Sequence, residues 1–340
     1  MVSRQAISDI PNALRTALAA VPAEIRGLVR RVRWGEGPLY VCGSGVASDL
    51  GQAAGYAFET LLGWPVVARS PTALQYYTPS LARPRSVLLL ISPGEADPEM
   101  QELAQAALRR DATVIVLTNS PENSLAKLTE HVLVVRAPTA QEGWTLLVCL
   151  HAALNLFAVL AAGMLKRPGP HQETLEREFE DLPDQLDRLA LQQASAVRSL
   201  AGELVGCERI SVLGGGFYHY PAFRLARSLA ESAGLAADGM EFTDNHSRLP
   251  GKRHAIVVLS GSHCKIKKLA HRAAAEWRVR GANVFAITDG NDRELTERSA
   301  MSLLVPTLAE VTGSTVSLFL GEWLAQAAAR SRDSGIGNRE

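Results

Sequence analysis

The sequence has no surplus of charge, no paired cysteine motif and no secretion signal. Lys and Arg number 35 and Asp and Glu number 35, so no excess of cations is available to displace counterions from nucleic-acid phosphates. None of the four cysteines forms a CxxC pair, which excludes zinc-ribbon and thioredoxin-like motifs. Scattered cysteines in a chain of 340 residues are typical of reduced thiols. We predict a cytoplasmic protein with no nucleic-acid partner, no metal and no cofactor.

One apolar run needs a separate interpretation. Residues 144–165 read WTLLVCLHAALNLFAVLAAGML, which is long enough to cross a bilayer. The run contains His151 and Asn155, stands alone, and is followed by sequence of globular character. We interpret it as a buried helix, with a membrane span as the alternative, and predict no membrane partner.

Apolar strand patterns alternate with helical patterns along the chain. In the first half, strands are predicted at 38–42, 65–69, 86–92, 113–120 and 131–137. In the second half, strands are predicted at 209–216, 255–262, 282–290 and 301–306. Continuous apolar strands separated by helices indicate parallel sheets that are covered on both faces.

The two halves repeat the same order of elements: a strand, a glycine turn, a helix, further strands and a long apolar helix. The sequence therefore predicts an α/β protein built from two copies of one unit. The predicted domains are an N-terminal helical extension, a first α/β domain, a helical connector, a second α/β domain and a tail, at 1–35, 36–168, 169–205, 206–330 and 331–340.

Glycine-rich turns follow the first strand of each half. Gly43-Ser44-Gly45 leads into a helix, where backbone N–H groups and the helix dipole attract an anion and the Ser44 hydroxyl adds a donor. The dinucleotide-binding spacing is absent, because Ser48 stands where its third glycine belongs, and Gly214-Gly215-Gly216 fails in the same way. A plain tight turn is the alternative interpretation of both segments.

Two further turns come after later strands, at the edge where ligands collect in α/β sheets. Ser92-Pro93-Gly94-Glu95-Ala96-Asp97 carries one hydroxyl and two acids, so an anion site or an acidic helix start are both open. Ser260-Gly261-Ser262-His263-Cys264 is richer in donors and is a candidate anion loop. One histidine and one cysteine are too few ligands to predict a metal there.

Glu231 and His246 are the candidate catalytic residues. Glu231 lies in a helix beside an apolar stripe that includes Leu225 and Leu229, which predicts a raised pKa for a general base. A salt bridge to Arg224 or Arg227 is the structural alternative. His246 lies in a polar loop, where a functional role and a plain surface position are both open.

These segments together resemble two tandem sugar isomerase (SIS) domains, over roughly residues 36–330. LYVCGSGVASDLG resembles the family's first strand and CGTS turn, and SVLLLISPGEADPEM stands where the family has its SxSGxT phosphate loop. LGGGFYHYPAFRLARSLAE resembles LGRGxxYPxALExALKLKE, whose final glutamate falls on Glu231. EFTDNHSRLPG stands near the family's E-x-x-HGP element and places His246 on its histidine.

The resemblance implies two five-stranded parallel sheets flanked by helices, and the long apolar helices predict a homodimer. It implies that Glu231 moves a proton between C1 and C2 of a sugar, that His246 opens the ring, and that Ser44 and Ser92 contact the phosphate. The predicted ligand contacts are Gly43, Ser44, Ser92, Gly94, Ser260 and Ser262. The phosphate loop departs from the family pattern, since one serine and the threonine are missing and an acid is present.

Two functions are consistent with these residues. The first is an isomerase, deaminase or deglycase that acts on a sugar phosphate, an amino sugar or a glycated amine, because an enediol or enamine route needs one base and one ring-opening acid. The second is a sugar-binding or regulatory protein that kept the fold without the chemistry, which the altered phosphate loop favours. In both, the partner is a small-molecule sugar derivative.

Overall fold

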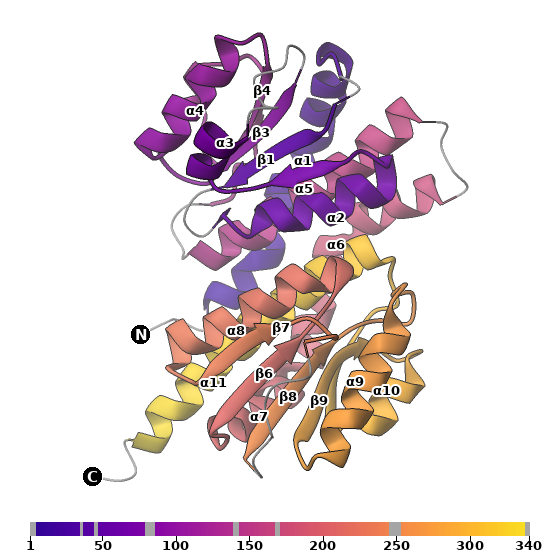
Figure 1. The fold of residues 1–340 in the computed structure, drawn as a ribbon. Helices are drawn as coiled ribbons and strands as arrows, with labels where there is room; N and C mark the ends of the chain where they lie inside the picture. The colour runs from indigo at the N-terminus through magenta and orange to yellow at the C-terminus, as the bar shows by residue number, and fades with distance from the viewer. Residues whose placement is uncertain are drawn as a thin grey trace. The chain divides into compact units, whose positions relative to one another are not determined.

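The computed structural model describes residues 5–34, 37–43, 47–78, 86–138, 143–166, 171–244 and 253–336. The chain divides into two compact units (Figure 1). The first unit covers residues 8–183, and the second holds residue 184 onward together with the first seven residues. Each unit is built around one parallel sheet of five strands.

The first sheet has the strand order β2-β1-β3-β4-β5 and is parallel throughout. Its strands are β1 (Leu39–Gly43), β2 (Val66–Ala68), β3 (Val87–Ser92), β4 (Thr113–Thr118) and β5 (Val132–Val134). Every residue of β1 and β3 is buried. Burial on both faces explains why these strands are continuous apolar runs without polar alternation.

Helices cover both faces of the first sheet. On one face, α2 (Leu50–Leu62) packs against β1, β2 and α5 (Gly143–Leu165). On the other face lie α3 (Pro71–Tyr77) and α4 (Pro98–Leu108), which contact each other. Alternate residues of the central strands, including Leu88 and Leu90, join Leu74 and Met100 from these two helices in one core cluster.

The predicted buried helix at 144–165 is observed as α5. Its window Thr145–Leu165 has the length and hydropathy of a membrane span, yet 83% of it is buried inside the structure. The helix therefore forms part of the core of the first unit. The predicted N-terminal helix is observed as α1 (Gln5–Arg31), whose Leu14, Ala17 and Leu28 are fully buried. From Ser8 onward this helix belongs to the first compact unit.

The second sheet has the order β10-β9-β8-β6-β7, which repeats the order of the first sheet. Its strands are β6 (Arg209–Leu213), β7 (Ala237–Met240), β8 (His254–Leu259), β9 (Asn283–Asp289) and β10 (Met301–Val305). The two halves thus share one topology, as the repeated pattern in the sequence predicts. The strand β7 was not among the predicted strands.

Helices also cover both faces of the second sheet (Figure 1). On one face α8 (His219–Ala233) packs on β6 and β7, and α11 (Glu310–Ile336) packs along α8 and α7 (Ala194–Val205). The other face carries α9 (Lys267–Val279) and α10 (Arg293–Arg298). The predicted connector is helical as α6 (Gln172–Gln192) and α7, and the boundary between the two units falls inside α6.

The first strand of each unit ends in a turn that only glycine fits. A Cβ at Gly43 would collide with the carbonyl of Ala47, and a Cβ at Gly214 would collide with the carbonyl of Tyr218. In both units the chain folds back on the strand end within four residues, which leaves no room for a side chain.

Candidate functional site

The strand order of the first unit places its candidate site at the β1/β3 junction. Connections leave β1 and β3 in opposite directions in this order, which creates a crevice at the carboxyl ends of the two strands where ligands bind. Gly43 is the register partner of Ile91, so the carboxyl ends of β1 and β3 lie side by side. Gly43 and Ser92 are thus brought together. Ser44 lies outside the described residues, so its predicted role stays a prediction.

The hydroxyl of Ser92 is bound within its own loop. Ser92 is 1% exposed, and its Oγ donates to the carbonyl of Gly94 at 3.1 Å. The same oxygen accepts a hydrogen bond from Nδ2 of Asn123 at 3.1 Å. This geometry does not present the Ser92 hydroxyl as a donor to a ligand, because its one O–H is already bonded to the Gly94 carbonyl. Gly94 itself is exposed.

Asn123 is a site residue that sequence reasoning missed. Its side chain is 2% exposed, its Nδ2 also donates to the carbonyl of Gly94, and its Oδ1 accepts from the amide of Leu125 at 2.8 Å. Asn123 therefore ties the turn after β3 to the turn after β4. The segment TNSPENSL is polar and follows a strand, which marks a loop but does not indicate which asparagine crosses to the neighbouring loop.

The loop after β3 carries negative charge. Oε1 of Glu95 accepts from the amide of Ser124 at 3.3 Å, and hydrogen bonds from Ser124 lower the pKa of the Glu95 carboxyl. Asp97 stands at the N-cap position of α4 without a side-chain capping hydrogen bond, and Glu99 follows in the first turn. Acids stabilise the start of a helix, but these carboxylates also repel a phosphate. An acidic helix start, the plain alternative for this segment, agrees with the geometry.

The equivalent crevice of the second unit is filled by a tyrosine. A Cβ at Gly261 would meet the hydroxyl oxygen of Tyr218 at 2.7 Å and Oδ2 of Asp289 at 3.1 Å. Burial raises the pKa of Tyr218 well above its usual value, so the phenol stays neutral. The amide of Ser262 donates to Oδ2 of Asp289 at 2.6 Å, and the hydroxyl oxygens of Ser260 and Ser262 are buried. Their predicted contact with a ligand stays a prediction.

Glu231 lies in the last turn of α8, and its side chain lies on the exposed side of that helix. Its side chain is 49% exposed, and Oε1 accepts from Nε of Arg227 at 2.7 Å. Nη1 of Arg224 lies 3.7 Å from Oε2. The i,i+4 spacing on the helix surface brings the arginine at 227 onto the carboxylate, while Leu225 and Leu229 face the core. The structural alternative, a salt bridge, is therefore present, and the role of Glu231 as a base stays a prediction.

Glu231 lies far from the crevice of its own unit. Tyr218, which fills that crevice, directly precedes α8, and Glu231 is the thirteenth residue of the helix. Twelve residues at 1.5 Å each correspond to about 18 Å along the helix axis. One sugar therefore cannot contact both Glu231 and the Ser260–Ser262 turn of the same unit. His246, the predicted ring-opening residue, lies outside the described residues.

A buried carboxylate on α11 is the second residue that sequence reasoning missed. Glu322 is 2% exposed, and its Oε1 accepts from Nε of Arg224 at 2.7 Å. Oγ of Ser228 lies 3.0 and 2.9 Å from its two carboxylate oxygens. Burial raises the pKa of Glu322, Arg224 and Ser228 lower it, and Glu231 raises it again. Arg224 thus lies between a buried carboxylate and the candidate base.

No group of three or more His, Cys, Asp or Glu residues that could hold a metal occurs among the described residues. The cysteines Cys42, Cys149, Cys207 and Cys264 are free thiols. Burial raises the pKa of Cys42, Cys149 and Cys264 to about 12. These three thiols therefore stay protonated and unreactive in the folded protein near neutral pH.

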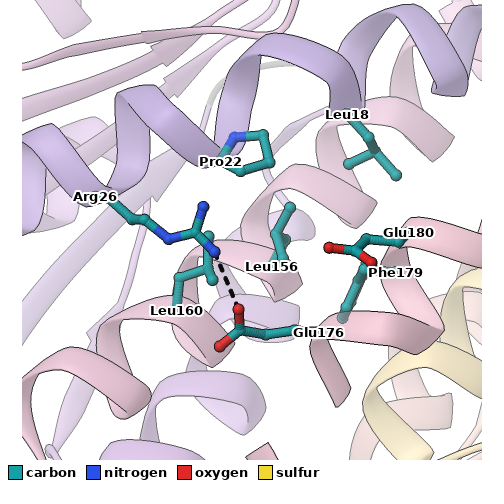
Figure 2. A pocket seen from close by; sticks show the side chains of 8 residues that line it. All are labelled: Leu18, Pro22, Arg26, Leu156, Leu160, Glu176, Phe179 and Glu180. Carbon is teal, nitrogen blue, oxygen red and sulfur yellow. Dashed lines mark hydrogen bonds and ion pairs between the residues drawn. The ribbon is translucent and has the colours of Figure 1, made fainter. Parts of the chain in front are cut away.

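A small cavity lies between α1, α5 and α6 of the first unit (Figure 2). Its volume is about 60 Å³. Apolar side chains such as Leu156 and Phe179 line it, and the ion pair of Arg26 with Glu176 (3.0 Å) lies at its side. Ligand pockets usually measure about 300–1,000 Å³, so this cavity is too small for a sugar.

The chain is similar in sequence to a curated protein. The glutamine–fructose-6-phosphate aminotransferase (isomerizing) of Synechocystis sp. is 25% identical over 297 residues, which cover 82% of this chain and 46% of that protein. The chain thus spans about half the length of this curated relative.

Three solved structures share the fold. The C-terminal domain of glucosamine-fructose-6-phosphate aminotransferase from Francisella tularensis has a TM-score of 0.82 at 16% identity, covering 96% of this chain and 95% of that chain. The tagatose-6-phosphate ketose/aldose isomerase of Escherichia coli has a TM-score of 0.75 at 18% identity, covering 96% and 91%. The glucosamine-6-phosphate deaminase of Thermotoga maritima has a TM-score of 0.69 at 15% identity, covering 97% and 94%.

The family match falls on the unit that holds the β1/β3 crevice. Residues 35–162 match the SIS domain family. The resemblance to this family that the sequence motifs predict is confirmed by a match over residues 35–162.

Proposed function

We propose that this chain is a double SIS enzyme that transfers a proton between neighbouring carbons of a sugar derivative. Its relatives include an aminotransferase of the isomerizing type, a ketose/aldose isomerase and a deaminase, and their names refer to 6-phosphosugars. The repeated strand order supports a second SIS domain in the second unit. The free thiols support a cytoplasmic location, and we propose a homodimer on the basis of the long apolar helices.

The observation that carries this proposal is the position of the Gly43 and Ser92 turns at the β1/β3 crevice of the family-matched domain. This crevice is the candidate sugar-binding site of the first unit, and the catalytic step is assigned to Glu231 from the resemblance of its helix to the family motif. In an open-chain aldose, Glu231 would take the proton from C2 as the C2–H electron pair forms the C1=C2 bond and the C1=O π pair moves to O1, which takes a proton from solvent to give an enediol. The same carboxyl would return its proton to C1 as O2 loses its proton to solvent and the C2=O bond of the ketose forms. For an aminated sugar, the corresponding intermediate is an enamine, and His246 would supply the acid that opens the ring.

The acidic turn after β3 indicates which sugar derivatives suit this crevice. The Glu95 carboxylate accepts from the amide of Ser124, and the Gly94 carbonyl accepts from the hydroxyl of Ser92, so both donors are already bonded within the chain. A phosphate at this turn would meet the charges of Glu95 and Asp97. An amino sugar or a glycated amine carries a cation that these carboxylates attract, and we therefore propose that class of substrate over a plain hexose 6-phosphate.

The test is proton exchange at C2 in deuterated water, followed by NMR, over a panel of aldose phosphates, amino sugars and glycated amines. We expect exchange with at least one amine-bearing sugar, and a loss of about 100-fold or more in Glu231→Gln because the general base is absent. The matched control is Glu276→Gln, which removes another exposed glutamate from an i,i+4 pair, here with Arg272 on α9. Equal exchange rates in both variants would contradict the role of Glu231.

A sugar-binding protein without catalysis is the second candidate. The internal bonding of Ser92 and the ion pairing of Glu231 favour it, because both groups already bind neighbouring groups of the chain. This function predicts a rise in melting temperature with one member of the same panel and no exchange of its C2 proton.

A further inference from the structure

Two arginines lie beside the Glu231 carboxylate, whereas an ordinary surface salt bridge has one. Arg227 binds the carboxylate directly, at 2.7 Å, and Arg224 approaches it from two turns earlier on α8, at 3.7 Å. Two guanidinium groups stabilise the ionised form of a carboxylate and reduce its affinity for a proton. Both arginines therefore contact the carboxylate that the proposed function uses as the base.

The buried carboxylate of Glu322 compensates one of these arginines. Its distance to Nε of Arg224 is 2.7 Å, which is 1 Å shorter than the contact of Arg224 with Glu231. Arg224 is only 9% exposed and Glu322 is 3% exposed by side chain, so solvent screens this pair little. Ser228 also donates to the Glu322 carboxylate and keeps it in place. Arg224, which binds that carboxylate, is therefore held toward the interior.

We propose that Glu322 is a positioning residue that sets the basicity of Glu231 by binding and neutralising Arg224. This inference rests on the proposed function of Glu231 as the base. With Glu322 ionised, the two carboxylates and the two arginines of the cluster sum to zero charge. When the negative charge of Glu322 is removed, the positive charge of Arg224 is no longer compensated and acts on Glu231.

Other charged groups near this end of α8 are bound elsewhere. Arg332 of α11 donates to the carbonyls of Ala233 and Gly234. Asp238 on β7 is bound by Arg209 on β6 at 3.2 Å. These groups remain in every variant described below, so they do not account for differences between variants.

Two variants with opposite expected effects test the proposal. In Glu322→Gln the uncompensated Arg224 lowers the proton affinity of Glu231, so the acid limb of the pH–rate profile moves about 0.5 to 1 pH unit lower and the plateau rate falls severalfold. In the double variant Arg224→Gln, Glu322→Gln, the nearer positive charge is also gone, so the limb lies at the wild-type pH or above it. Glu276→Gln serves as the control and leaves the limb in place.

The carboxyl ¹³C resonance of Glu231 gives a second reading that needs no substrate. It is assigned by its absence in Glu231→Gln, and its titration midpoint is expected to follow the same order among the variants. If no sugar of the panel reacts but the midpoints move as stated, the catalytic proposal fails and the coupling stands. If turnover persists and neither midpoint nor limb moves in Glu322→Gln, the coupling is refuted.

The double variant also guards against a failure to fold. Glu322→Gln leaves Arg224 buried and unpaired, which is strongly destabilising, whereas the double variant buries no unpaired charge. If only the double variant folds, its acid limb in the pH–rate profile and its Glu231 titration midpoint decide the test. Values below those of the wild type refute the proposal, and values at or above them support it.

Discussion

Replacing the buried histidine of α5 should remove a large part of the acid sensitivity of the first unit. His151 is 1% exposed, and burial lowers its pKa from 6.5 to about 3. Its Nδ1 lies 3.4 Å from Nδ2 of Asn155, one turn further along the helix. We choose His151→Gln because glutamine retains an amide beside Asn155 but cannot take up a proton.

The sign of the effect follows from where protons bind. Below about pH 6.5 the unfolded chain protonates His151, while the folded unit keeps it neutral until pH falls to about 3. The unfolded state therefore binds more protons in this window, so stability falls as pH falls. Each pH unit contributes about 1.4 kcal/mol, which gives roughly 2 kcal/mol between pH 6.5 and pH 5 from this residue alone.

Hydrogen exchange of the slowest α5 amides measures this difference, after correction for the intrinsic exchange rate at each pH. The wild-type free energy of opening should fall by about 2 kcal/mol more than that of His151→Gln between pH 6.5 and pH 5. His171→Gln, at an exposed position of the same unit, should behave as the wild type does. Equal pH dependence in the wild type and His151→Gln would show that His151 takes up its proton without unfolding, and the reasoning from burial would be refuted.

Two loop substitutions test the β1/β3 crevice. Asn123→Ala should destabilise the first unit by about 2–3 kcal/mol, since it leaves the buried amide of Leu125 without an acceptor. Urea unfolding measures this loss of stability. Faster amide hydrogen exchange at residues 93–97 checks that the two loops separate. Gly43→Ala should abolish any ligand-induced rise in melting temperature, because its methyl group collides with the Ala47 carbonyl, whereas Gly94→Ala, with open space around its Cβ, should retain it.

The interior strands could be predicted from sequence because burial on both faces leaves a continuous apolar run. The predicted strand at 86–92 is observed as β3 at 87–92, and that at 282–290 as β9 at 283–289. The short edge strand β7 reads ADGM, and all four of its residues are partly exposed. It pairs with β6 on one side only, so neither length nor hydrophobicity distinguishes it from a loop.

The surroundings of the candidate residues could not be predicted in the same way. Glu322 meets Arg224 across 98 positions of sequence, and nothing in the local pattern of α11 indicates that this glutamate faces inward. The contact of Asn123 with Ser92 likewise joins two loops that are 31 residues apart. For Glu231, the apolar neighbours on the helix were read correctly, but the side chain points away from them toward an arginine four residues earlier.

In each unit a carboxylate accepts a backbone N–H between the loops at the ends of two neighbouring strands, in opposite directions in the two units. In the first unit, the carboxylate of Glu95 accepts from the amide of Ser124. In the second unit, the carboxylate of Asp289 accepts from the amide of Ser262. A bound phosphate would have to replace these carboxylates or lie beside them, at about 1 kcal/mol for each unit charge at 4 Å in water and more where solvent is excluded. A ligand amine incurs no such repulsion and can pair with Glu95 directly. The charge of the turn, more than the number of its hydroxyls, is therefore what should separate amine-bearing sugars from plain sugar phosphates in binding to this protein.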